Sequence, residues 1–413
     1  MIVLDAINLG VNMDHDDVKS FSQGALKGIR VVDFSRYIAG PYCARLLAYL
    51  GADVVRVEKP SGGEDRYVTP LYGDTSALLS MTGLGKRGLT LDLKSPDSRV
   101  IVERLVGAAD VVIVNMPAKV LKRMGLDYDS LKSIKKDIIL TTQTCFGHDG
   151  PWSDWAGFDG IAQVMSGSAF MSGTEEGPRR SATPYADYTT AVLGAFGTIA
   201  ALRQRDQDGE GQHVQTSLLG SAIGAFSSAI IEQETLNTDR RPDGNRGQTT
   251  APTDIFRTRD GSVITQVVGD GLFSRIAKVI GKSEWIGDVR FESDQSRADH
   301  RNYICETVGK WASNYTTKEV LEKLSSVGVP CGPVLGITEV ASHPQVNAME
   351  FVEEINLVGA NDKIHATRVP LDFSNYKPPL GKPPSIGEHS EEVLKEIGFS
   401  DSEIQDFMES HVI

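Results

Sequence analysis

Residues 28–67 read GIRVVDFSRYIAGPYCARLLAYLGADVVRVEKPSGGEDRY. Two short runs rich in β-branched residues, at 29–34 and 53–58, flank a segment from Ala39 to Leu50 whose apolar residues have helical spacing. A strand, a helix and another strand in this order predict a βαβ unit, because two parallel strands need a long crossover connection. Both runs are almost continuously apolar, which is typical of parallel strands that are buried on both faces.

The same pattern continues to about residue 145. Further candidate strands are LTLDL at 89–93, DVVIVN at 110–115 and DIILTT at 137–142, and a helix is expected over 98–108, after Pro96. These alternating elements predict an α/β fold with an open, doubly wound parallel sheet. In such a sheet the ligand lies beyond the carboxyl ends of the strands, so we expect the functional site there.

The second half of the chain has a different composition. Gly, Ser and Ala become frequent after residue 150, and RRPDGNRGQ at 240–248 is a strong loop signal. FRTRDGSVITQVV at 256–268 predicts two strands joined by an Asp-Gly turn, and helix-like stretches follow to about residue 326. We expect a second, smaller α/β domain here. An amphipathic helix over 389–397 predicts a return of the chain to the first domain.

Composition and charge exclude several classes of protein. The 413 residues include 42 Lys and Arg against 55 Asp and Glu, and the formal net charge of −13 disfavours a nucleic-acid partner. The four cysteines form no Cys-x-x-Cys pair and the histidines no His-x-x-x-His pair, so no metal site is expected. No apolar run approaches the roughly 18 residues of a membrane span. The acidic first 25 residues lack the features of a signal peptide, so we expect a mobile tail and a cytoplasmic protein.

Residues 83–88, GLGKRG, match the G-x-G-x-x-G string of dinucleotide sites. A strand-like run follows them instead of the helix that such a site requires, so a nicotinamide or flavin site is not expected. Two interpretations of this loop stay open. It approaches an anionic ligand through Lys86 and Arg87, or it is a solvated charged turn.

Asp187 precedes an apolar run with helical character, in TPYADYTTAVLGAFG. An aspartate at a helix start is most simply an N-cap, whose carboxylate accepts from free main-chain N–H groups. A poorly hydrated carboxylate at this position also suits a nucleophile. The local sequence does not choose between the two roles. His148, in the loop FGHDGP, is expected to be structural.

Several motifs in a constant order resemble the family III CoA-transferases, also called the CaiB/BaiF family, which include the formyl-CoA:oxalate and carnitine-type enzymes. They are the stretch at 28–67, GKRGLTLDL at 85–93, ADVVIVNMPAKVLKRMGLDY at 109–128, GVPCGPV at 328–334 and GEHSEEVLKEIGF at 387–399. The resemblance implies a Rossmann-like large domain made from both ends of the chain, a smaller inserted domain, and an interlocked ring-like homodimer. Together with the signals above it predicts a tail over 1–25, the large domain over 26–225, the small domain over 226–330, and the C-terminal return over 331–413.

The resemblance also implies an activity and its site. The nucleophilic aspartate of the family falls on Asp187, which implies CoA transfer from an acyl-CoA to a small carboxylic acid through an aspartyl anhydride and an aspartyl-CoA thioester. CoA is then a substrate, and neither a metal nor a tightly bound cofactor is expected. The implied glycine loop over the intermediates contains Gly244 and Gly247. The implied CoA contacts are Ile38, Ala39, Lys59, Gly83, Leu84, Gly85, Lys86, Asn115, Met116 and Arg123. Lys59, Lys86 and Arg123 suit the phosphates, whereas Ile38 and Met116 suit the adenine.

The acyl group and the exact chemistry are less determined. Arg179 and Arg180 precede Asp187 and favour a dicarboxylate, so we expect a donor such as succinyl-CoA. One alternative is an acyl-CoA racemase, in which related enzymes use the histidine of an AGHD motif. This chain has Phe158 at that place, and phenylalanine transfers no proton. The other alternative is a catalytically silent CoA-binding homologue. Thr144 and Cys145 differ from the formyl-CoA type at the substrate end.

Overall fold

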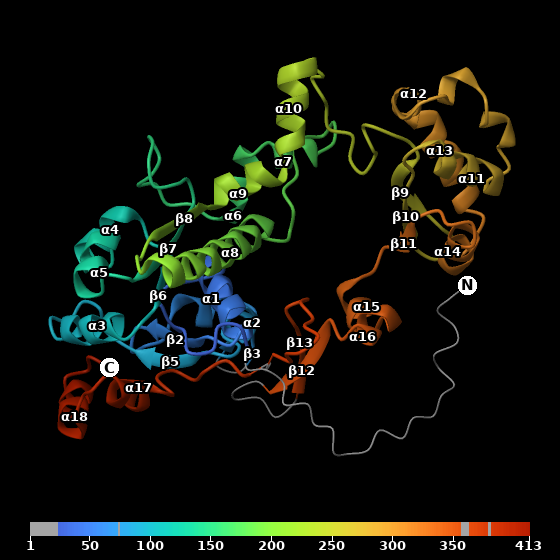
Figure 1. The fold of residues 1–413 in the computed structure, drawn as a ribbon. Coiled ribbons are helices and arrows are strands. Elements are labelled where there is room, and N and C mark those ends of the chain that lie inside the picture. Colours follow the sequence, from blue (N-terminus) through green and yellow to red (C-terminus); the bar gives the residue numbers. More distant parts are fainter. Residues whose placement is uncertain (1–23, 73–74, 357–362, 379–380) are drawn as a thin grey trace.

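A computed structural model describes residues 24–72, 75–356, 363–378 and 381–413. The expected tail over 1–25 therefore lies almost entirely outside the described residues. The chain forms a large α/β unit, a smaller unit built from later residues, and a C-terminal segment that returns to the first unit (Figure 1). The domain boundaries given above stay predictions.

A six-stranded parallel sheet forms the centre of the large unit. Its order is β5 (Arg87–Thr90), β2 (Asp53–Glu58), β1 (Arg30–Asp33), β6 (Val111–Val114), β7 (Ile139–Thr144) and β8 (His213–Ser217). The predicted α/β class and five of these strands are confirmed. β5 begins and ends earlier than the expected 89–93, because the chain turns at Asp92, where Ser95 N–H donates to its carbonyl. β8 was not predicted.

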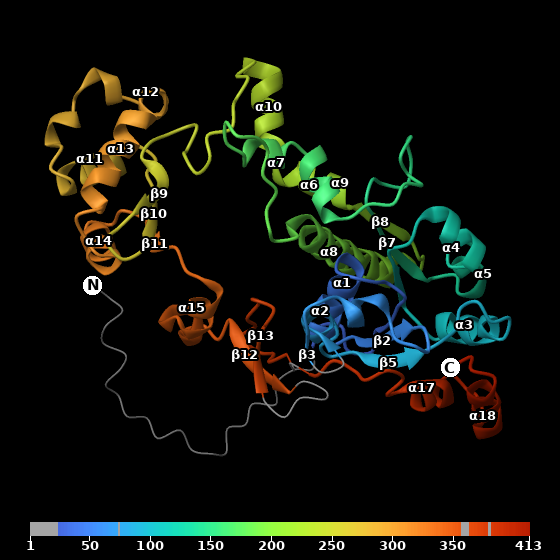
Figure 2. The same cartoon turned by 180° about the vertical axis from the view of Figure 1, so that it is seen from behind.

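Helices cover both faces of this sheet, as Figures 1 and 2 show. Alternate residues of β1 pack in opposite directions, since Val31 belongs to one hydrophobic core and Val32 to the other. The first core includes α1 (Ala39–Tyr49) and α8 (Tyr185–Asp208), and the second includes α3 (Ser98–Gly107) and α5 (Tyr128–Ile134). Burial on both faces explains why the strand sequences are almost continuously apolar.

Shorter elements complete the large unit. A loop and 3-10 helix η1 (Glu64–Tyr67) follow β2, and then come β3 (Leu71–Tyr72), β4 (Thr75–Ser76) and α2 (Ala77–Thr82). The remaining helices are α4 (Ala118–Met124), α6 (Asp159–Met165), α7 (Ser168–Met171), α9 (Leu218–Ala225) and α10 (Ser227–Leu236). In the part of the chain that the structure describes, no helix combines the length and apolar character needed to cross a membrane.

The smaller unit has its own three-stranded antiparallel sheet and its own hydrophobic core. Its strands are β9 (Thr253–Arg257), β10 (Ser262–Gln266) and β11 (Cys331–Pro333), so the predicted hairpin with its Asp260-Gly261 turn is confirmed. The helical part consists of α11 (Asp270–Val279), η2 (Ser283–Trp285), η3 (Val289–Phe291), α12 (Asp294–Asp299), α13 (Arg301–Ala312) and α14 (Thr317–Ser325). Both views show this unit apart from the six-stranded sheet (Figures 1 and 2).

The last eighty residues lead back to the edge strand of the large sheet. They pass through α15 (Ile337–Ser342), α16 (Pro344–Ala348) and the hairpin of β12 (Val352–Asn356) and β13 (Lys363–Thr367), and end in α17 (Ser390–Glu396) and α18 (Asp401–Glu409). α17 confirms the helix expected over 389–397. Gly88 of β5 donates to His389 Nδ1, and His389 N–H donates to the Gly88 carbonyl. The C-terminal segment thus covers the open edge of β5.

Candidate active site

Asp187 lies in the first turn of α8, where it is half-buried and does not cap its own helix. The cap comes from Asp159, the first residue of α6. Its Oδ1 accepts from the N–H of Ala186 at 2.7 Å and from the N–H of Asp187 at 3.1 Å. Of the two roles left open for Asp187, the N-cap role is therefore wrong, and its carboxylate is available for chemistry.

Asp159 is itself held in place by Gln163, one helical turn later. The Nε2 of Gln163 donates to Asp159 Oδ2, and its Oε1 accepts from Ser181 N–H at 2.8 Å. Both side chains are buried. The pair therefore connects α6, the segment before α8 and the α8 start in one hydrogen-bonded arrangement, which leaves the Asp187 main chain little freedom.

The environment of Asp187 raises its pKa from 3.8 to about 7, first through burial and then through the charge of Asp159. The thiol of Cys145 is close enough to feel both carboxylates. Burial, followed by the charges of Asp187 and Asp159, raises its pKa to about 11, so the thiol is protonated at neutral pH. A poorly hydrated carboxylate that ionises near neutral pH is suited to attack a carbonyl carbon.

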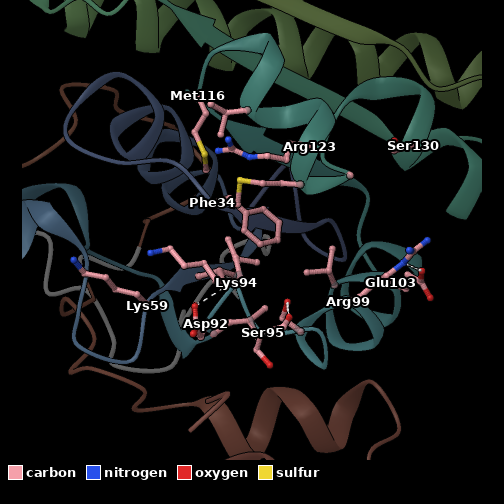
Figure 3. Close-up of a pocket in the computed structure, with 18 of the residues that line it drawn as sticks. Phe34, Lys59, Asp92, Lys94, Ser95, Arg99, Glu103, Met116, Arg123 and Ser130 are labelled. Carbon is pink, nitrogen blue, oxygen red and sulfur yellow. Dashed lines mark hydrogen bonds and ion pairs between the residues drawn. The ribbon is translucent and has the colours of Figure 1, made fainter.

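A large cavity of about 1340 Å³ lies at the carboxyl ends of β1, β2, β5 and β6, where the sequence placed the ligand. Apolar side chains, including those of Phe34, Met116, Val102 and Val120, line part of it. Its basic residues are Arg36, Lys59, Lys94, Arg99, Lys122 and Arg123. Figure 3 shows Lys59 and Lys94 on one side of Phe34, and Met116 and Arg123 on the other. An apolar surface with cations around it suits a phosphorylated aromatic ligand.

The structure brings three of the ten predicted CoA contacts, Lys59, Met116 and Arg123, into this cavity. Asn115 lies next to it and holds the chain after β1, because its side chain accepts from Arg36 N–H and donates to the Arg36 carbonyl. Ile38 and Ala39 lie at the start of α1. Ala39 packs in one small hydrophobic cluster with Ala186, the neighbour of Asp187. These residues thus connect the cavity with the start of α8.

The glycine loop around Gly83, Leu84 and Gly85 packs against the C-terminal segment. A Cβ at Gly381 would lie 2.7 Å from Gly85 Cα, and a Cβ at Gly83 would lie 3.1 Å from Pro383. Leu84 is buried in a cluster with β12 and β13. This close approach of two main chains, with positive φ angles at Gly85 and Gly381, explains the glycines at both positions.

The basic residues of the same loop have partners of their own, so the interpretation of the loop as a solvated charged turn is wrong. Lys86 is fully buried, and its Nζ donates to Asp33 Oδ2 at 2.8 Å and to the Pro41 carbonyl at 2.7 Å. Arg87 pairs with Asp53 and Glu396. The Lys86 ammonium group thus already has a carboxylate partner, and the expected contact between this side chain and a phosphate stays a prediction.

Gly244 and Gly247 lie in a loop that links the two units. Gly244 N–H donates to the Gly173 carbonyl at 3.0 Å, in the segment that precedes α8, and Gly247 N–H donates to the Thr253 carbonyl at 2.8 Å. A Cβ at Gly247 would lie 2.7 Å from Thr253, so this glycine permits close packing. The loop is near the chain leading to Asp187, but its closure over intermediates stays a prediction.

Sequence reasoning missed two groups of site residues. Asp159 and Gln163 carry a weak signal, since Asp and Gln four residues apart lie on one face of a helix. Lys94 carries a stronger one, because it directly follows a candidate strand at the expected ligand-binding edge. Arg179 and Arg180, by contrast, are exposed, and Arg179 pairs with Glu176.

Comparison with known proteins gives one consistent result. The sequence profile of CoA-transferase family III matches residues 26–390. The succinate–glutarate CoA-transferase of Agrobacterium fabrum is 32% identical over 392 residues, 90% of this chain and 95% of that protein. The succinyl-CoA–L-malate CoA-transferase beta subunit of Chloroflexus aurantiacus is also 32% identical, over 94% of this chain and 98% of that protein. A CaiB/BaiF family protein from Brucella suis has a similar crystal structure, with a TM-score of 0.80, 29% identity and coverage of 91% of this chain and all of that chain.

Proposed function

Because the chain belongs to CoA-transferase family III and is an enzyme that transfers CoA, we propose that Asp187 is its nucleophile and that the acyl donor is a small dicarboxylyl-CoA. The observation that carries the proposal is the arrangement at the α8 start. Asp159 satisfies the main-chain N–H groups there, so the carboxylate of Asp187 is left for covalent chemistry.

The proposed reaction begins when an Asp187 oxygen attacks the thioester carbonyl of the donor. The C–S bond breaks, which gives an aspartyl mixed anhydride and CoA thiolate. The thiolate then attacks the Asp187 carbonyl carbon and releases the donor acid, which leaves an aspartyl-CoA thioester. The acceptor carboxylate attacks this thioester and repeats the two steps in reverse. Each step exchanges one activated acyl bond for another, so neither ATP nor a metal is needed.

Residues around Asp187 support this chemistry in different ways. Burial lowers the hydration of the carboxylate and so raises its energy in the resting state. The Asp159–Gln163 pair keeps the nucleophile in position. The Gly244 loop is joined to the segment that precedes α8 by the hydrogen bond from the Gly244 N–H to the Gly173 carbonyl. Closure of such a loop would exclude water from a hydrolysable anhydride.

Two observations support a dicarboxylyl donor. Relatives at about 30% identity are named for succinyl-CoA or succinate, including the succinyl-CoA:mesaconate CoA-transferase of Haloarcula hispanica. In addition, Arg180 is exposed near the start of α6, where a Cβ at Gly160 would lie 3.7 Å from its Cδ. A guanidinium group in this position is available to pair with a distal carboxylate.

The CoA nucleotide is proposed to bind in the large cavity. Phe34 and Met116 offer apolar surface to the adenine, and Lys59 and Arg123 offer charge to the phosphates. Lys59 pairs with Glu64 at 3.2 Å in an exposed position, so this cation is held at the cavity rim and is accessible to a ligand. Ile38, Ala39 and the Gly83–Lys86 main chain are proposed to contact the pantetheine arm.

An exchange assay tests the proposal. Purified enzyme is mixed with succinyl-CoA and a panel of mono- and dicarboxylates, and new acyl-CoA species are measured by chromatography. We expect transfer to dicarboxylates, and its loss in Asp187→Ala with CoA affinity unchanged. Turnover that persists in Asp187→Ala would contradict the assignment of the nucleophile. Transfer from acetyl-CoA only would contradict the dicarboxylyl donor.

The isomerase alternative receives no support from the site. A racemase needs two groups that move protons on opposite sides of the α-carbon. Phe158 stands at the histidine position, where it is exposed and forms a T-shaped ring pair with Tyr37. A phenylalanine supplies no proton there.

Two copies of the chain are proposed to interlock as a homodimer. Large apolar side chains on α8 and α10 are exposed in the single chain, including Phe196 at 70% and Leu236 at 71%. Surfaces of this kind mark sites of protein association. Light scattering coupled to gel filtration tests this, and we expect twice the chain mass of 44.7 kDa. A monomer at micromolar concentration would contradict it.

A further inference from the structure

Lys94 lines the cavity at the edge-strand end of the sheet. It follows β5, the edge strand, whereas Lys59 follows β2, the next strand. The Asp187 site lies towards the other end of the sheet, near Cys145, which follows β7, the strand before the last one. A line along the carboxyl edge of the sheet therefore runs from Asp187 past β6 and β1 to Lys59, and reaches Lys94 last.

The covalent order of CoA is the thiol, the pantetheine arm, the pyrophosphate, and then the adenosine with its 3′-phosphate. With the thiol at Asp187, the pyrophosphate meets the cations nearer the nucleophile and the 3′-phosphate meets those farther away. We propose, on the basis of the proposed function, that Lys94 and the Ser95 hydroxyl bind the 3′-phosphate of CoA and thereby distinguish CoA from nucleotides that lack it.

Among the cavity cations that follow β1, β2 and β5, the ion pairs favour Lys94. Lys122 and Arg123 also lack an ion pair among the described residues, but they lie on α4, which follows β6 and is nearer to the Asp187 end of the sheet. Arg99 pairs with Glu103 at 3.0 Å, and Arg36 and Lys59 share Glu64. Lys94 has no ion pair with any residue that the structure describes. Figure 3 shows its side chain extending on the same side of Phe34 as that of Lys59. A phosphomonoester dianion would give Lys94 the countercharge that the chain does not supply.

The loop that carries Lys94 is fixed before any ligand binds. Asp92 N–H donates to the Val412 carbonyl at 2.7 Å, and Lys94 N–H donates to Asp92 Oδ1 at 3.0 Å. Ser95 Oγ accepts from Asp97 N–H at 3.3 Å, which orients the oxygen and leaves its own proton free to donate to a phosphate. A preorganised loop loses little entropy on binding.

Calorimetric titration with CoA and with dephospho-CoA, which lacks only the 3′-phosphate, tests the assignment. We expect Lys94→Ala to weaken CoA binding about 10-fold, the loss typical of one charge-assisted hydrogen bond, and to leave dephospho-CoA binding unchanged. Lys59→Ala should weaken the binding of both nucleotides by the same factor. Lys119→Ala is the matched control, because Lys119 pairs with Asp154 outside the cavity lining, and it should change neither affinity.

The outcomes separate the inference from the proposed function. A Lys94→Ala variant that still prefers CoA over dephospho-CoA by the wild-type factor would overturn the inference alone. Equal weakening of both nucleotides would also overturn it, because it would place Lys94 at the pyrophosphate. A wild-type protein that binds neither nucleotide would overturn the proposed function as well. Recovery of the preference in Lys94→Arg would support a charge-based contact.

Discussion

Asp159 accepts a hydrogen bond from the main-chain N–H of Asp187 at 3.1 Å, and its charge adds to the effect of burial in raising the pKa of the Asp187 carboxyl. The residue that holds the main chain of Asp187 therefore also contributes, after burial, to the proton affinity of its carboxylate. This double role leads to a prediction that separates positioning from electrostatics.

Replacement of Asp159 by Asn should lower the pKa of Asp187, since the amide carries no charge. The amide oxygen still accepts from the two N–H groups, so the α8 start keeps its cap, whereas the amide nitrogen replaces Oδ2 and loses the hydrogen bond from Gln163 Nε2. In the wild type we expect kcat/KM to fall as the pH drops below about 7, because the attacking carboxylate must be ionised; this fall is the acidic limb of the pH profile. In Asp159→Asn this limb should move to lower pH. A limb that stays in place while the rate falls would indicate a purely structural role.

Stability should depend on pH through Asp187 itself. Its pKa in the folded protein is raised from 3.8 to about 7, so folding favours the protonated form. The free energy of unfolding therefore decreases as the pH rises from about 4 to about 7, because the ionised form of Asp187 is less favourable in the folded protein than in the unfolded chain. Asp187→Asn removes this cost. We expect its Tm to exceed that of the wild type at pH 8 and the difference to shrink towards pH 4. Equal Tm values at pH 8 would contradict the burial of the charged form.

The buried pair of Lys86 and Asp33 should be more important for folding than for binding. Removal of one partner leaves an unpaired charge in the interior, at a cost of about 3–5 kcal/mol. We expect Lys86→Met to lower the free energy of unfolding by this order in urea titrations. The double variant Lys86→Met with Asp33→Asn should recover part of the loss, because it removes the orphaned charge. An unchanged free energy of unfolding in Lys86→Met would contradict a structural role of this ion pair.

The contact between Gly85 and Gly381 should be sensitive to a single methyl group. Gly381→Ala places a Cβ 2.7 Å from Gly85 Cα and requires a positive φ. We expect a loss of about 1–3 kcal/mol of stability. Gly107→Ala is the control, because a Cβ there meets nothing within 4 Å. If both variants unfold at the wild-type urea concentration, the C-terminal segment is not held against this loop.

Strands buried on both faces could be predicted from the sequence, but strands without an apolar run could not. β1 and β2 were found because their residues are apolar on both faces. β8 reads HVQTS and is only partly buried, so it lacks the hydrophobic signal, and it is defined by pairing with β7. The pairing of a short polar strand is decided by tertiary structure.

In the candidate site, likewise, contacts between residues that are distant in the sequence could not be predicted. The family resemblance predicts Asp187 as the nucleophile, whereas the local N-cap rule pointed to a role that the structure contradicts. The true cap, Asp159, lies 28 residues earlier in the chain, outside any local pattern. Likewise, the sequence around Lys86 does not indicate that its ammonium group forms an ion pair with Asp33, 53 residues away. Apolar patterns identify elements, but the partners of charged groups depend on the folded chain.

The central claim is that Asp187 becomes covalently attached to CoA during transfer. Enzyme mixed with succinyl-CoA in the absence of acceptor, quenched in acid and examined by intact-mass and peptide mass spectrometry, tests it most directly. We predict a mass increase equal to CoA less one water, located on the peptide that contains Asp187 and removed by hydroxylamine. Asp187→Asn should show no such increase. Transfer activity with an unmodified Asp187 peptide, or modification at another residue, would contradict the account.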